Sequence, residues 1–297
     1  MSNAEQMILM SPDPKPIFRF APSPNGYLHL GHAYSAILCH DLARSAGGQF
    51  LLRMEDIDIT RCKPEFETAI LEDMDWLQLI HDGPVLRQSD RFDAYRDDLT
   101  RLTEQGLVYP ASMTRGEIRD FVARFEAAGQ TWPRDPDGAP HYPGQERQQP
   151  GEGSDGAAVA FRLDTDRATD NVGQLNWRET GAGPDGQSGV IEADPTIWGD
   201  AVLARKDVPT SYHLAVVADD AAQGITHVVR GIDLFWSTSF HRLLQELLGL
   251  PTPVYNHHRL VLDEAGRKLS KSDQDTGLRE LRAAGWTAPD VRRHLGL

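Results

Sequence analysis

The sequence predicts an α/β fold in which a parallel sheet is interrupted by an inserted subdomain, and two observations lead to this prediction. Apolar stretches with strand character alternate with segments of helical periodicity through residues 16–106, and strands that alternate with helices form parallel sheets. The pattern breaks over residues 107–205 and returns over 206–297. We therefore expect one sheet domain in two halves, separated by a smaller α+β subdomain and preceded by a flexible leader at 1–15.

The first half begins with a strand, a turn and a helix. Ile17–Phe20 is a short apolar strand, and Ala33–Ala43 has helical apolar spacing that ends at Gly47-Gly48, a typical helix stop. A second strand covers Phe50–Met54. Pro64 opens a helix, since proline suits the first helical position. A separate helix is predicted further along the chain. The helix from Pro64 has its apolar positions at Phe66, Ile70, Met74 and Leu77, and the later helix covers Arg91–Gln105.

The remaining elements are read from short apolar runs and from glycine-rich loops. Ala157–Leu163 and Ala201–Arg205 are predicted strands of the inserted subdomain, while Tyr212–Ala218 and Thr226–Arg230 are predicted to restore the main sheet. Two segments without periodicity are predicted loops, and the C-terminal residues are expected to form two short helices packed on the sheet domain. The loops are Gly144–Gly156 and Gly181–Gly189, and the C-terminal piece is Gly277–Leu297.

Composition excludes several classes of protein. The 297 residues include 40% hydrophobic and 25% charged residues with no apolar run long enough to span a bilayer, so we expect a cytoplasmic protein and, because nothing demands a partner copy, a monomer. Met1–Ser11 lacks the pattern of a secretion signal. Cys39 and Cys62 are the only cysteines, which excludes a disulfide framework. The net charge of −14 disfavours general adhesion to nucleic acid, so an RNA partner would require a local basic face. Arg115, Arg119 and Arg242 are possible contacts, each more typical of a solvated charge.

The segment His29-Leu30-Gly31-His32 follows a strand that breaks on Pro22, Ser23, Pro24 and Gly26. The two histidines are three residues apart at a helix start, so both imidazoles lie on one face, where the helix dipole favours an anionic phosphate. Alone, this spacing is more often a pair of surface histidines. The flanking prolines and glycine favour a phosphate-binding turn over a pair of surface histidines.

A second short segment, Lys268-Leu269-Ser270-Lys271-Ser272, follows Gly266 near the end of the chain. Its two cations on a flexible loop could close over the β- and γ-phosphates of a nucleotide. A solvated basic turn is the commoner explanation of such a run. The pairing with the first segment makes it informative, and Lys271 is the predicted cation for a departing pyrophosphate.

Together the two segments resemble the signatures of the class I aminoacyl-tRNA synthetases of the glutamyl type, over residues 17–273. The resemblance implies a Rossmann-like parallel sheet, catalytic roles for His29, His32 and Lys271, and ATP binding by these residues with Gly31, Lys268 and Ser270. Only 25 residues follow Ser272, so we expect no anticodon-binding domain. This length, and Val216 where full-length glutamyl enzymes typically have asparagine, resemble the shortened subgroup, the glutamyl-Q tRNA(Asp) synthetases.

Glutamate recognition requires a cation for the side-chain carboxylate and an anion for the α-amino group, and the sequence offers Arg19, Glu55 and Arg230 at strand ends. Each alone could be an ordinary ion pair. The family resemblance implies a larger glutamate-binding set, which is Arg19, Ala21, Ser23, Glu55, Tyr212 and Arg230.

The resemblance implies ATP with Mg²⁺, L-glutamate and a queuosine-bearing tRNA(Asp) as reactants, with glutamate activated as an adenylate and transferred to the queuosine base. Some relatives bind zinc through cysteines, but Ala111 and Met113 stand at two of those positions here, so we expect no structural zinc. Three alternatives stay open: a truncated glutamyl-tRNA synthetase charging tRNA(Glu), an RNA-independent carboxylate–amine ligase, and a synthetase-like binding protein without activity.

Overall fold

The main sheet has seven strands in the order β3-β2-β1-β9-β10-β6-β7. This arrangement comes from a computed structural model that describes residues 15–144, 159–170, 172–262 and 277–297. Neighbouring strands are parallel except β6 and β7, which pair antiparallel. The predicted parallel α/β fold is thus confirmed. The strands are β1 (Ile17–Phe20), β2 (Gln49–Met54), β3 (Leu86–Arg87), β6 (Asn176–Glu179), β7 (Gly189–Glu192), β9 (His227–Gly231) and β10 (Val254–His258).

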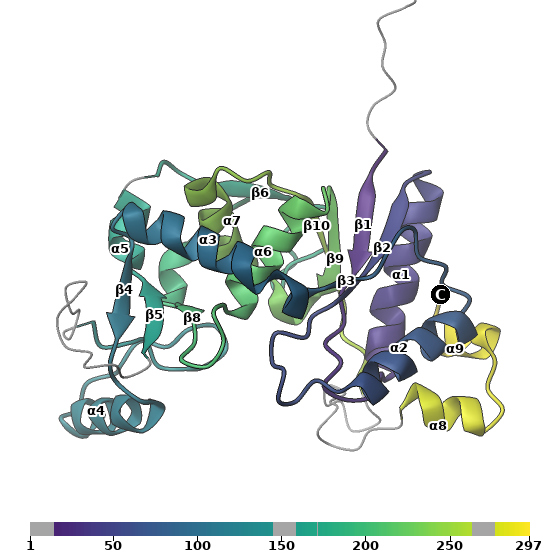
Figure 1. Ribbon diagram of the computed structural model, residues 1–297, viewed down its shortest axis with the longest axis horizontal. Helices are drawn as coiled ribbons and strands as arrows, with labels where there is room; N and C mark the ends of the chain where they lie inside the picture. Colours follow the sequence, from purple (N-terminus) through teal and green to yellow (C-terminus); the bar gives the residue numbers. More distant parts are fainter. Residues whose placement is uncertain (1–14, 145–158, 171, 263–276) are drawn as a thin grey trace, which may run out of the picture.

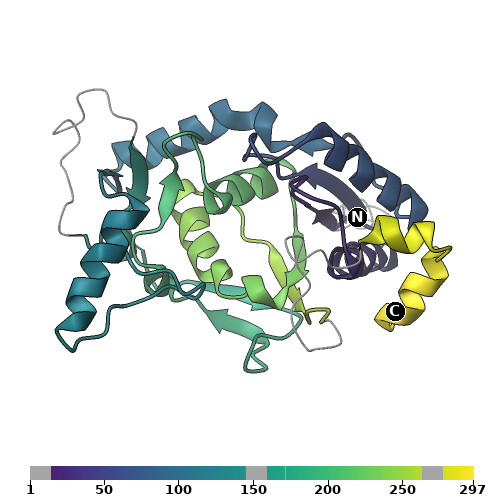
Figure 2. The same cartoon turned by 90° about the horizontal axis from the view of Figure 1, so that it is seen from below.

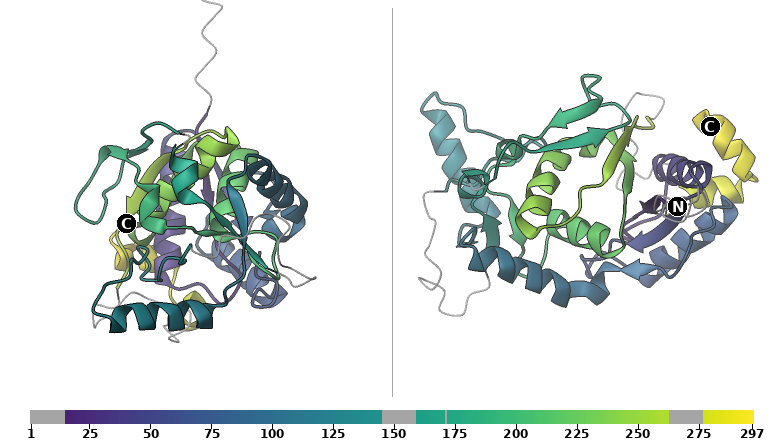
Figure 3. Two further views of the ribbon diagram at one scale, coloured as in Figure 1. Left: turned by 90° about the vertical axis from the view of Figure 1, so that its left-hand side faces the viewer. Right: turned by 90° about the horizontal axis from the view of Figure 1, so that it is seen from above.

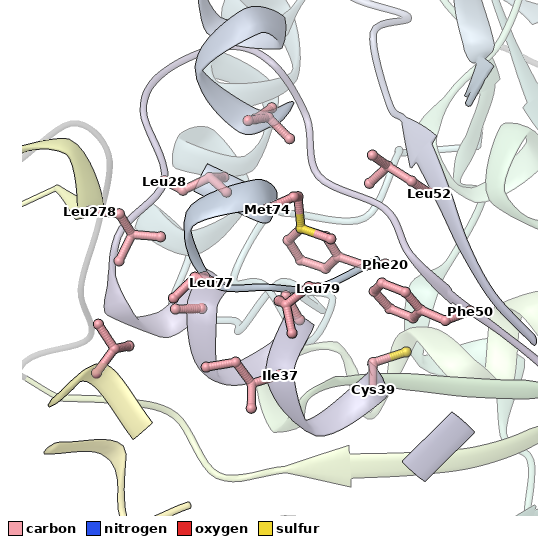
Figure 4. Packing of buried hydrophobic residues seen from close by; sticks show 14 of the residues in the cluster. Phe20, Leu28, Ile37, Cys39, Phe50, Leu52, Met74, Leu77, Leu79 and Leu278 are labelled. Atoms are coloured by element: carbon pink, nitrogen blue, oxygen red, sulfur yellow. The ribbon is translucent and has the colours of Figure 1, made fainter. Parts of the chain in front are cut away.

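Four helices gather beside strands β1 and β2 at one end of the molecule (Figure 1). They are α1 (Leu30–Ser45), α2 (Pro64–Trp76), α8 (Leu278–Ala283) and α9 (Ala288–Leu295). The last two confirm the predicted pair of C-terminal helices, which pack against α2 and α1. Figure 4 shows the core between these elements, a cluster of buried apolar side chains that includes Phe20, Leu28, Ile37, Phe50, Leu52, Met74, Leu77 and Leu278.

The inserted subdomain contains a separate antiparallel sheet of three strands, β4 (Val108–Ala111), β5 (Ala160–Leu163) and β8 (Val202–Ala204). Its helix α4 (Arg115–Ala127) begins with a capping box, in which the Thr114 hydroxyl accepts from the Glu117 N–H and the Glu117 carboxylate accepts from the Thr114 N–H. Seen from below and from above, this subdomain and the C-terminal helices lie at opposite ends of the molecule (Figure 2, Figure 3). A short helix, α5 (Thr165–Asp170), follows β5.

Strands β6 and β7 lie within residues 107–205, yet they join the main sheet. The predicted loop Gly181–Gly189 connects them, with Gly189 as the first residue of β7. The register is set by β10, since Tyr255 pairs with Glu179 and the Tyr255 carbonyl accepts from the Thr180 N–H. Each strand has only four residues, and β6 pairs with β10 more than 70 residues further along the chain, so no local pattern predicts that β6 and β7 join the main sheet.

The prediction of a strand at Tyr212–Ala218 was wrong, because these residues form the first part of helix α6 (Tyr212–Ala222). Ser211 caps the helix by accepting from the Leu214 N–H. The helix is central, packed against α3 (Phe92–Glu104) and α7 (Ser237–Leu248), so Leu214 to Asp220 are all buried. A helix buried on most sides has a continuous apolar run, and such a run is indistinguishable from a buried strand by periodicity.

Other predicted elements are confirmed with small shifts of their ends, including the strands that became β1, β2 and β9 and the helices α1, α2 and α3. Short 3₁₀ turns occur at Gln88–Arg91, Pro195–Trp198 and Ile232–Leu234. Apart from Gly144, the predicted loop Gly144–Gly156 lies outside the described residues, as does Met1–Ser11. Within the described ranges, none of the helices combines the length and the hydrophobicity that crossing a membrane requires.

Candidate active site

A cleft of about 620 Å³ opens at the carboxyl ends of β1, β2, β9 and β10. Strand β1 is the third of the seven strands, with β2 and β3 on one side and β9, β10, β6 and β7 on the other. Ligands of open α/β sheets bind at such a point, where the strand order reverses and the ends of neighbouring loops separate. The cleft therefore lies where the fold itself favours a ligand site.

Helix α1 directs its N-terminus into this cleft, with both predicted histidines in its wall. His29 is the N-cap, and its Nδ1 accepts from the Gly31 N–H at 3.1 Å, while His32 Nδ1 accepts from the His29 N–H at 3.2 Å. The two rings lie 3.8 Å apart between centroids. Because both Nδ1 atoms are acceptors, the hydrogen of each neutral ring is on Nε2. This arrangement suits donation to a phosphate oxygen.

Gly31 has a structural reason to be glycine. A Cβ atom at this position would lie 3.0 Å from Cε1 and 3.1 Å from Nδ1 of His29, too close for a side chain without movement of the imidazole. The glycine thus allows His29 to fold back on the helix start as its cap.

Arg19 at the end of β1 belongs to a buried network of four charges. Its Nε donates to Asp220 Oδ1 at 2.9 Å and its Nη2 to Asp220 Oδ2 at 3.4 Å. Arg53 Nη1 donates to the same Oδ1 at 2.8 Å, and Arg53 Nη2 donates to Glu55 at 3.1 Å. Burial opposes ionisation of Asp220, but the two guanidinium groups outweigh it and hold its pKa below the usual range. The positive charge of Arg19 is therefore compensated inside the protein.

Glu55 follows β2 and lines the cleft. Burial raises the pKa of this carboxyl, and the nearby guanidinium groups of Arg53 and Arg19 only partly offset the effect. A cation arriving in the cleft would favour the ionised form. Glu55 is thus suited to an ammonium group.

Arg230 near the end of β9 differs from Arg19 in its partners. It is 5% exposed, and four of its five N–H groups donate to neutral acceptors. Within the described residues no carboxylate oxygen lies within 4.0 Å of its guanidinium group. The acceptors are His257 Nε2 at 3.0 Å, His241 Nδ1 at 3.3 Å, the Leu234 carbonyl at 3.0 Å and Thr238 Oγ1 at 2.7 Å.

A buried cation without an adjacent anion is costly unless a ligand supplies the negative charge. Arg230 lines the cleft, so the cleft has an uncompensated positive charge at β9 in addition to the helix dipole of α1. The neighbouring histidines stay neutral, since burial lowers the pKa of both His213 and His257 to about 4. They therefore add no second cation, and the site is suited to one carboxylate beside a phosphate.

The structure brings together nine of the predicted site residues in the wall of this one cleft: Arg19, Ala21, Ser23, His29, Gly31, His32, Glu55, Tyr212 and Arg230. Tyr212 begins α6, and burial raises the pKa of its phenol to about 12, so it stays a neutral hydrogen-bonding group. The predicted residues Lys268, Ser270, Lys271 and Ser272 lie outside the described residues.

Residues 17–292 match the model of the family named "tRNA synthetases class I (E and Q), catalytic domain", where E and Q denote glutamate and glutamine. The chain belongs to this family. It is accordingly a ligase of the aminoacyl-tRNA synthetase type, and glutamate, ATP and tRNA are the substrates of the glutamate-specific members.

The relatives include both kinds of enzyme that the motifs suggested. A glutamyl-Q tRNA(Asp) synthetase of Rhodobacter capsulatus is 50% identical over 95% of this chain and 100% of its own length. Another, from Thiobacillus denitrificans, is 42% identical over 88% of this chain and 79% of its own length. A glutamate–tRNA ligase of Synechococcus is 37% identical over 94% of this chain, which spans 57% of that enzyme. The predicted resemblance to the shortened subgroup is confirmed.

Solved structures agree on the fold. A glutamate tRNA ligase of Elizabethkingia meningosepticum, in complex with its amino acid, superposes with a TM-score of 0.69 and 30% identity. The match covers 88% of this chain and 52% of that ligase. This chain thus corresponds to about half the length of the tRNA ligases that it resembles.

A second cleft, of about 470 Å³, adjoins the first and shares Ser23, Glu55 and Tyr212 with it. Its far wall belongs to the inserted subdomain and combines aromatic rings with arginines. Arg162 lies over the ring of Tyr142 at 4.5 Å and donates to the Asp200 carbonyl at 2.6 Å. Arg115, one of the possible RNA contacts, lines this cleft, whereas Arg242 forms an ion pair with Glu246 on α7.

The segment in which the family resemblance led us to look for zinc ligands begins at the end of β4. Ala111 is its last residue and is 2% exposed, and Met113 packs beside it in a small apolar cluster. In the part of the chain that the structure describes, no group of three or more His, Cys, Asp or Glu side chains is arranged to hold a metal ion. The expectation of no structural zinc stays a prediction, and metal analysis of the purified protein tests it.

Sequence reasoning missed the partners behind the site. Asp220 on helix α6 joins two arginines from strands β1 and β2, and Glu179 with His257 supports Arg230 from β6 and β10. One signal was available: the pair Asp219-Asp220 directly follows the apolar run that ends at Ala218, and buried acidic residues need charged partners. No such local signal distinguished Glu179.

Proposed function

We propose that the protein activates L-glutamate with ATP to form glutamyl-adenylate and then transfers the glutamyl group to the queuosine base at the wobble position of tRNA(Asp). The observation that carries the proposal is the single cleft in which the N-terminus of α1, with His29 and His32, faces the uncompensated cation Arg230. One end of this cleft is suited to phosphate and the other to a carboxylate.

In the activation step, a carboxylate oxygen of glutamate attacks the α-phosphorus of ATP in line, and the bond from that phosphorus to the bridging oxygen breaks to release pyrophosphate. The Nε2–H groups of His29 and His32 donate to the α-phosphate oxygens as charge develops on them. Magnesium arriving with ATP would neutralise part of the phosphate charge. Lys271, outside the described residues, would bind the leaving pyrophosphate.

Recognition of the amino acid divides between two charges. Arg230 would bind the side-chain carboxylate, and Glu55 the α-ammonium group, whose charge offsets the burial that raises the pKa of Glu55. Arg19, Ala21, Ser23 and Tyr212 line the space between them. Glutamine would leave Arg230 without an anion, so the site would favour glutamate.

The second step requires an acceptor beside the adenylate. A nucleophilic group of the modified base attacks the glutamyl carbonyl carbon, and the bond to the phosphate oxygen breaks to release AMP. The second cleft supports this step, because it shares Ser23, Glu55 and Tyr212 with the first and offers Tyr142 and Arg162 for contact with a base or its backbone. The Rhodobacter relative, matched along its whole length, supports the choice of acceptor by its name.

A second candidate is charging of tRNA(Glu) at its 3′ adenosine, which the 37% identity to glutamate–tRNA ligases favours. Transfer of radiolabelled glutamate separates the two. We expect label on tRNA(Asp) that contains queuosine, including tRNA that ends in 2′,3′-dideoxyadenosine, and none on tRNA(Asp) without queuosine. Label only on tRNA(Glu), abolished by the dideoxy end, would establish the second candidate instead. Label on no RNA, with glutamate-dependent consumption of ATP, would point to an RNA-independent ligase.

A further inference from the structure

Arg230 can present its charge to the cleft only if the groups behind it accept hydrogen bonds. Its Nε–H points at His257 Nε2 at 3.0 Å. An arginine has no acceptor atom, so His257 Nε2 must carry a lone pair, and the ring must carry its hydrogen on Nδ1. The other tautomer, or the imidazolium ion, would place two N–H groups against each other.

Glu179 supplies the group that selects this tautomer. This residue is 2% exposed, and Oε2 lies 2.6 Å from His257 Nδ1. The other oxygen, Oε1, accepts from the backbone N–H of Gly181 at 2.8 Å and of His257 at 2.9 Å. Burial alone would raise the pKa of Glu179, but the hydrogen bond with the His257 ring, helped by these two backbone donors, outweighs burial and holds the pKa below its usual value. The carboxylate thus faces the ring with an acceptor only.

The three groups form a linear chain from β6 through β10 to β9, in which every donor and acceptor is determined by the next. Neither Glu179 nor His257 lines the cleft. With the two Nη2 hydrogen bonds to Leu234 and Thr238 and one from Nη1 to His241, the chain occupies four of five arginine donors. Hydrogen bonds from Nε, Nη1 and Nη2 therefore fix the plane of the Arg230 guanidinium group, and the fifth N–H, on Nη1, is not used by them.

We propose that Glu179 and His257 are positioning residues for substrate binding: the carboxylate sets the tautomer of His257, and His257 sets the orientation of the Arg230 guanidinium group. This inference rests on the proposed function, in which Arg230 binds the glutamate carboxylate. It adds two residues, 78 positions apart in the chain, that contact no substrate and yet determine the affinity for glutamate.

Glu179→Gln tests the chain with a change of one heavy atom. The amide oxygen can keep both backbone hydrogen bonds, which leaves the amide nitrogen to donate toward His257 Nδ1. The ring must then carry its hydrogen on Nε2, against the Arg230 Nε–H. We expect the KM for glutamate to rise about tenfold or more, as for loss of one hydrogen bond to a charged group, while the KM for ATP stays within about twofold. Glu192→Gln, on the exposed face of neighbouring β7, is the matched control.

Two substitutions of His257 separate positioning from packing. The amide of glutamine reaches the place of Nε2 and can accept from Arg230, whereas the amide of asparagine reaches only the place of Nδ1. We expect the KM for glutamate of His257→Gln to stay within about threefold of wild type and that of His257→Asn to rise about tenfold. Equal losses in both variants would refute the positioning role, and this comparison stands even if Glu179→Gln does not fold.

The tautomer itself is read from ¹⁵N NMR of histidine-labelled protein, with the His257 signals assigned from His257→Gln. Wild type should show hydrogen on Nδ1, and Glu179→Gln should show it on Nε2. Hydrogen on Nε2 in wild type, or no change in the variant, would overturn the inference. This measurement requires no turnover, so it decides the inference even if wild type shows no glutamate-dependent ATP–pyrophosphate exchange with RNA present, a result that would refute the proposed function instead.

Discussion

Asp73 on helix α2 gives the sharpest prediction for stability. It is 1% exposed, and neither carboxylate oxygen has a hydrogen-bond partner in the structure. The nearest cation among the described residues is Arg282 of α8, whose Nη1 lies 3.8 Å from Oδ1 and whose Nη2 binds Glu72. Burial raises the pKa of Asp73 to about 7, with Arg282 opposing and Glu72 and Glu280 adding to the rise.

The sign and size of the effect follow from linkage. An aspartate of the unfolded chain ionises near 3.8, so at pH values between 3.8 and 7 the unfolded state gains ionisation that the folded state resists. The folded protein is therefore destabilised as pH rises through this window, by about 1 kcal/mol at pH 4.5 and about 4 kcal/mol at pH 8. Movement of Arg282 toward the carboxylate stabilises the ionised form in the folded protein. We therefore expect the destabilisation at pH 8 to exceed that at pH 4.5 by about 2 to 3 kcal/mol.

Asp73→Asn removes the ionisation and retains the shape of the side chain. The free energy of unfolding in urea should increase, relative to wild type, by about 2 to 3 kcal/mol more at pH 8 than at pH 4.5. The pH dependence is the diagnostic quantity, because the buried amide has its own cost, which is the same at both pH values. Asp75→Asn, exposed on the same helix, is the control. A difference from wild type that does not vary with pH would refute the reasoning.

Three further predictions concern the site. Arg230→Gln should lower kcat/KM for glutamate about 100-fold or more in steady-state exchange assays, because the substrate carboxylate loses its charged partner. An unchanged kcat/KM would exclude Arg230 as that partner. His32→Ala should lower kcat about 100-fold with little change in the KM for glutamate, and a change in that KM alone would contradict a role in phosphate transfer. Asp220→Asn leaves Arg19 and Arg53 under-compensated and should lower the free energy of unfolding at pH 7 by about 3 to 5 kcal/mol. Because the folded pKa of Asp220 is lowered, its contribution to the free energy of unfolding is present above the unfolded pKa of 3.8 and is lost as pH falls through the folded pKa. Urea titrations at pH 7 measure this contribution, and equal stability of variant and wild type there would contradict the network.

Much of the fold could be predicted because its signals are local. Pro64 at the first position of α2, the glycines after α1 and the alternation of short strands with helices are each visible within a few residues. The error at Tyr212–Ala218 has the same origin: a helix buried on most sides loses its amphipathic pattern, and only the packing of α3 and α7 around it shows why.

The candidate site divides in the same way. The motif residues and their chemistry were recognisable in the sequence, and the structure placed nine of them in one cleft. The electrostatic difference between Arg19 and Arg230 was not recognisable in the sequence, because it depends on the partners of each arginine. Arg19 meets Asp220 from 201 positions away, while Arg230 meets His257 and no carboxylate within the described residues.

The sequence by itself determined which residues are able to bind phosphate, carboxylate and ammonium, since those abilities belong to side-chain types and to their spacing along one turn or strand. Only the tertiary structure decided which charges are compensated and which remain for a ligand. Compensation depends on distances of about 3 Å between residues far apart in the chain. For Arg230 those distances are set by the position of β10 between β9 and β6, which no local pattern specifies.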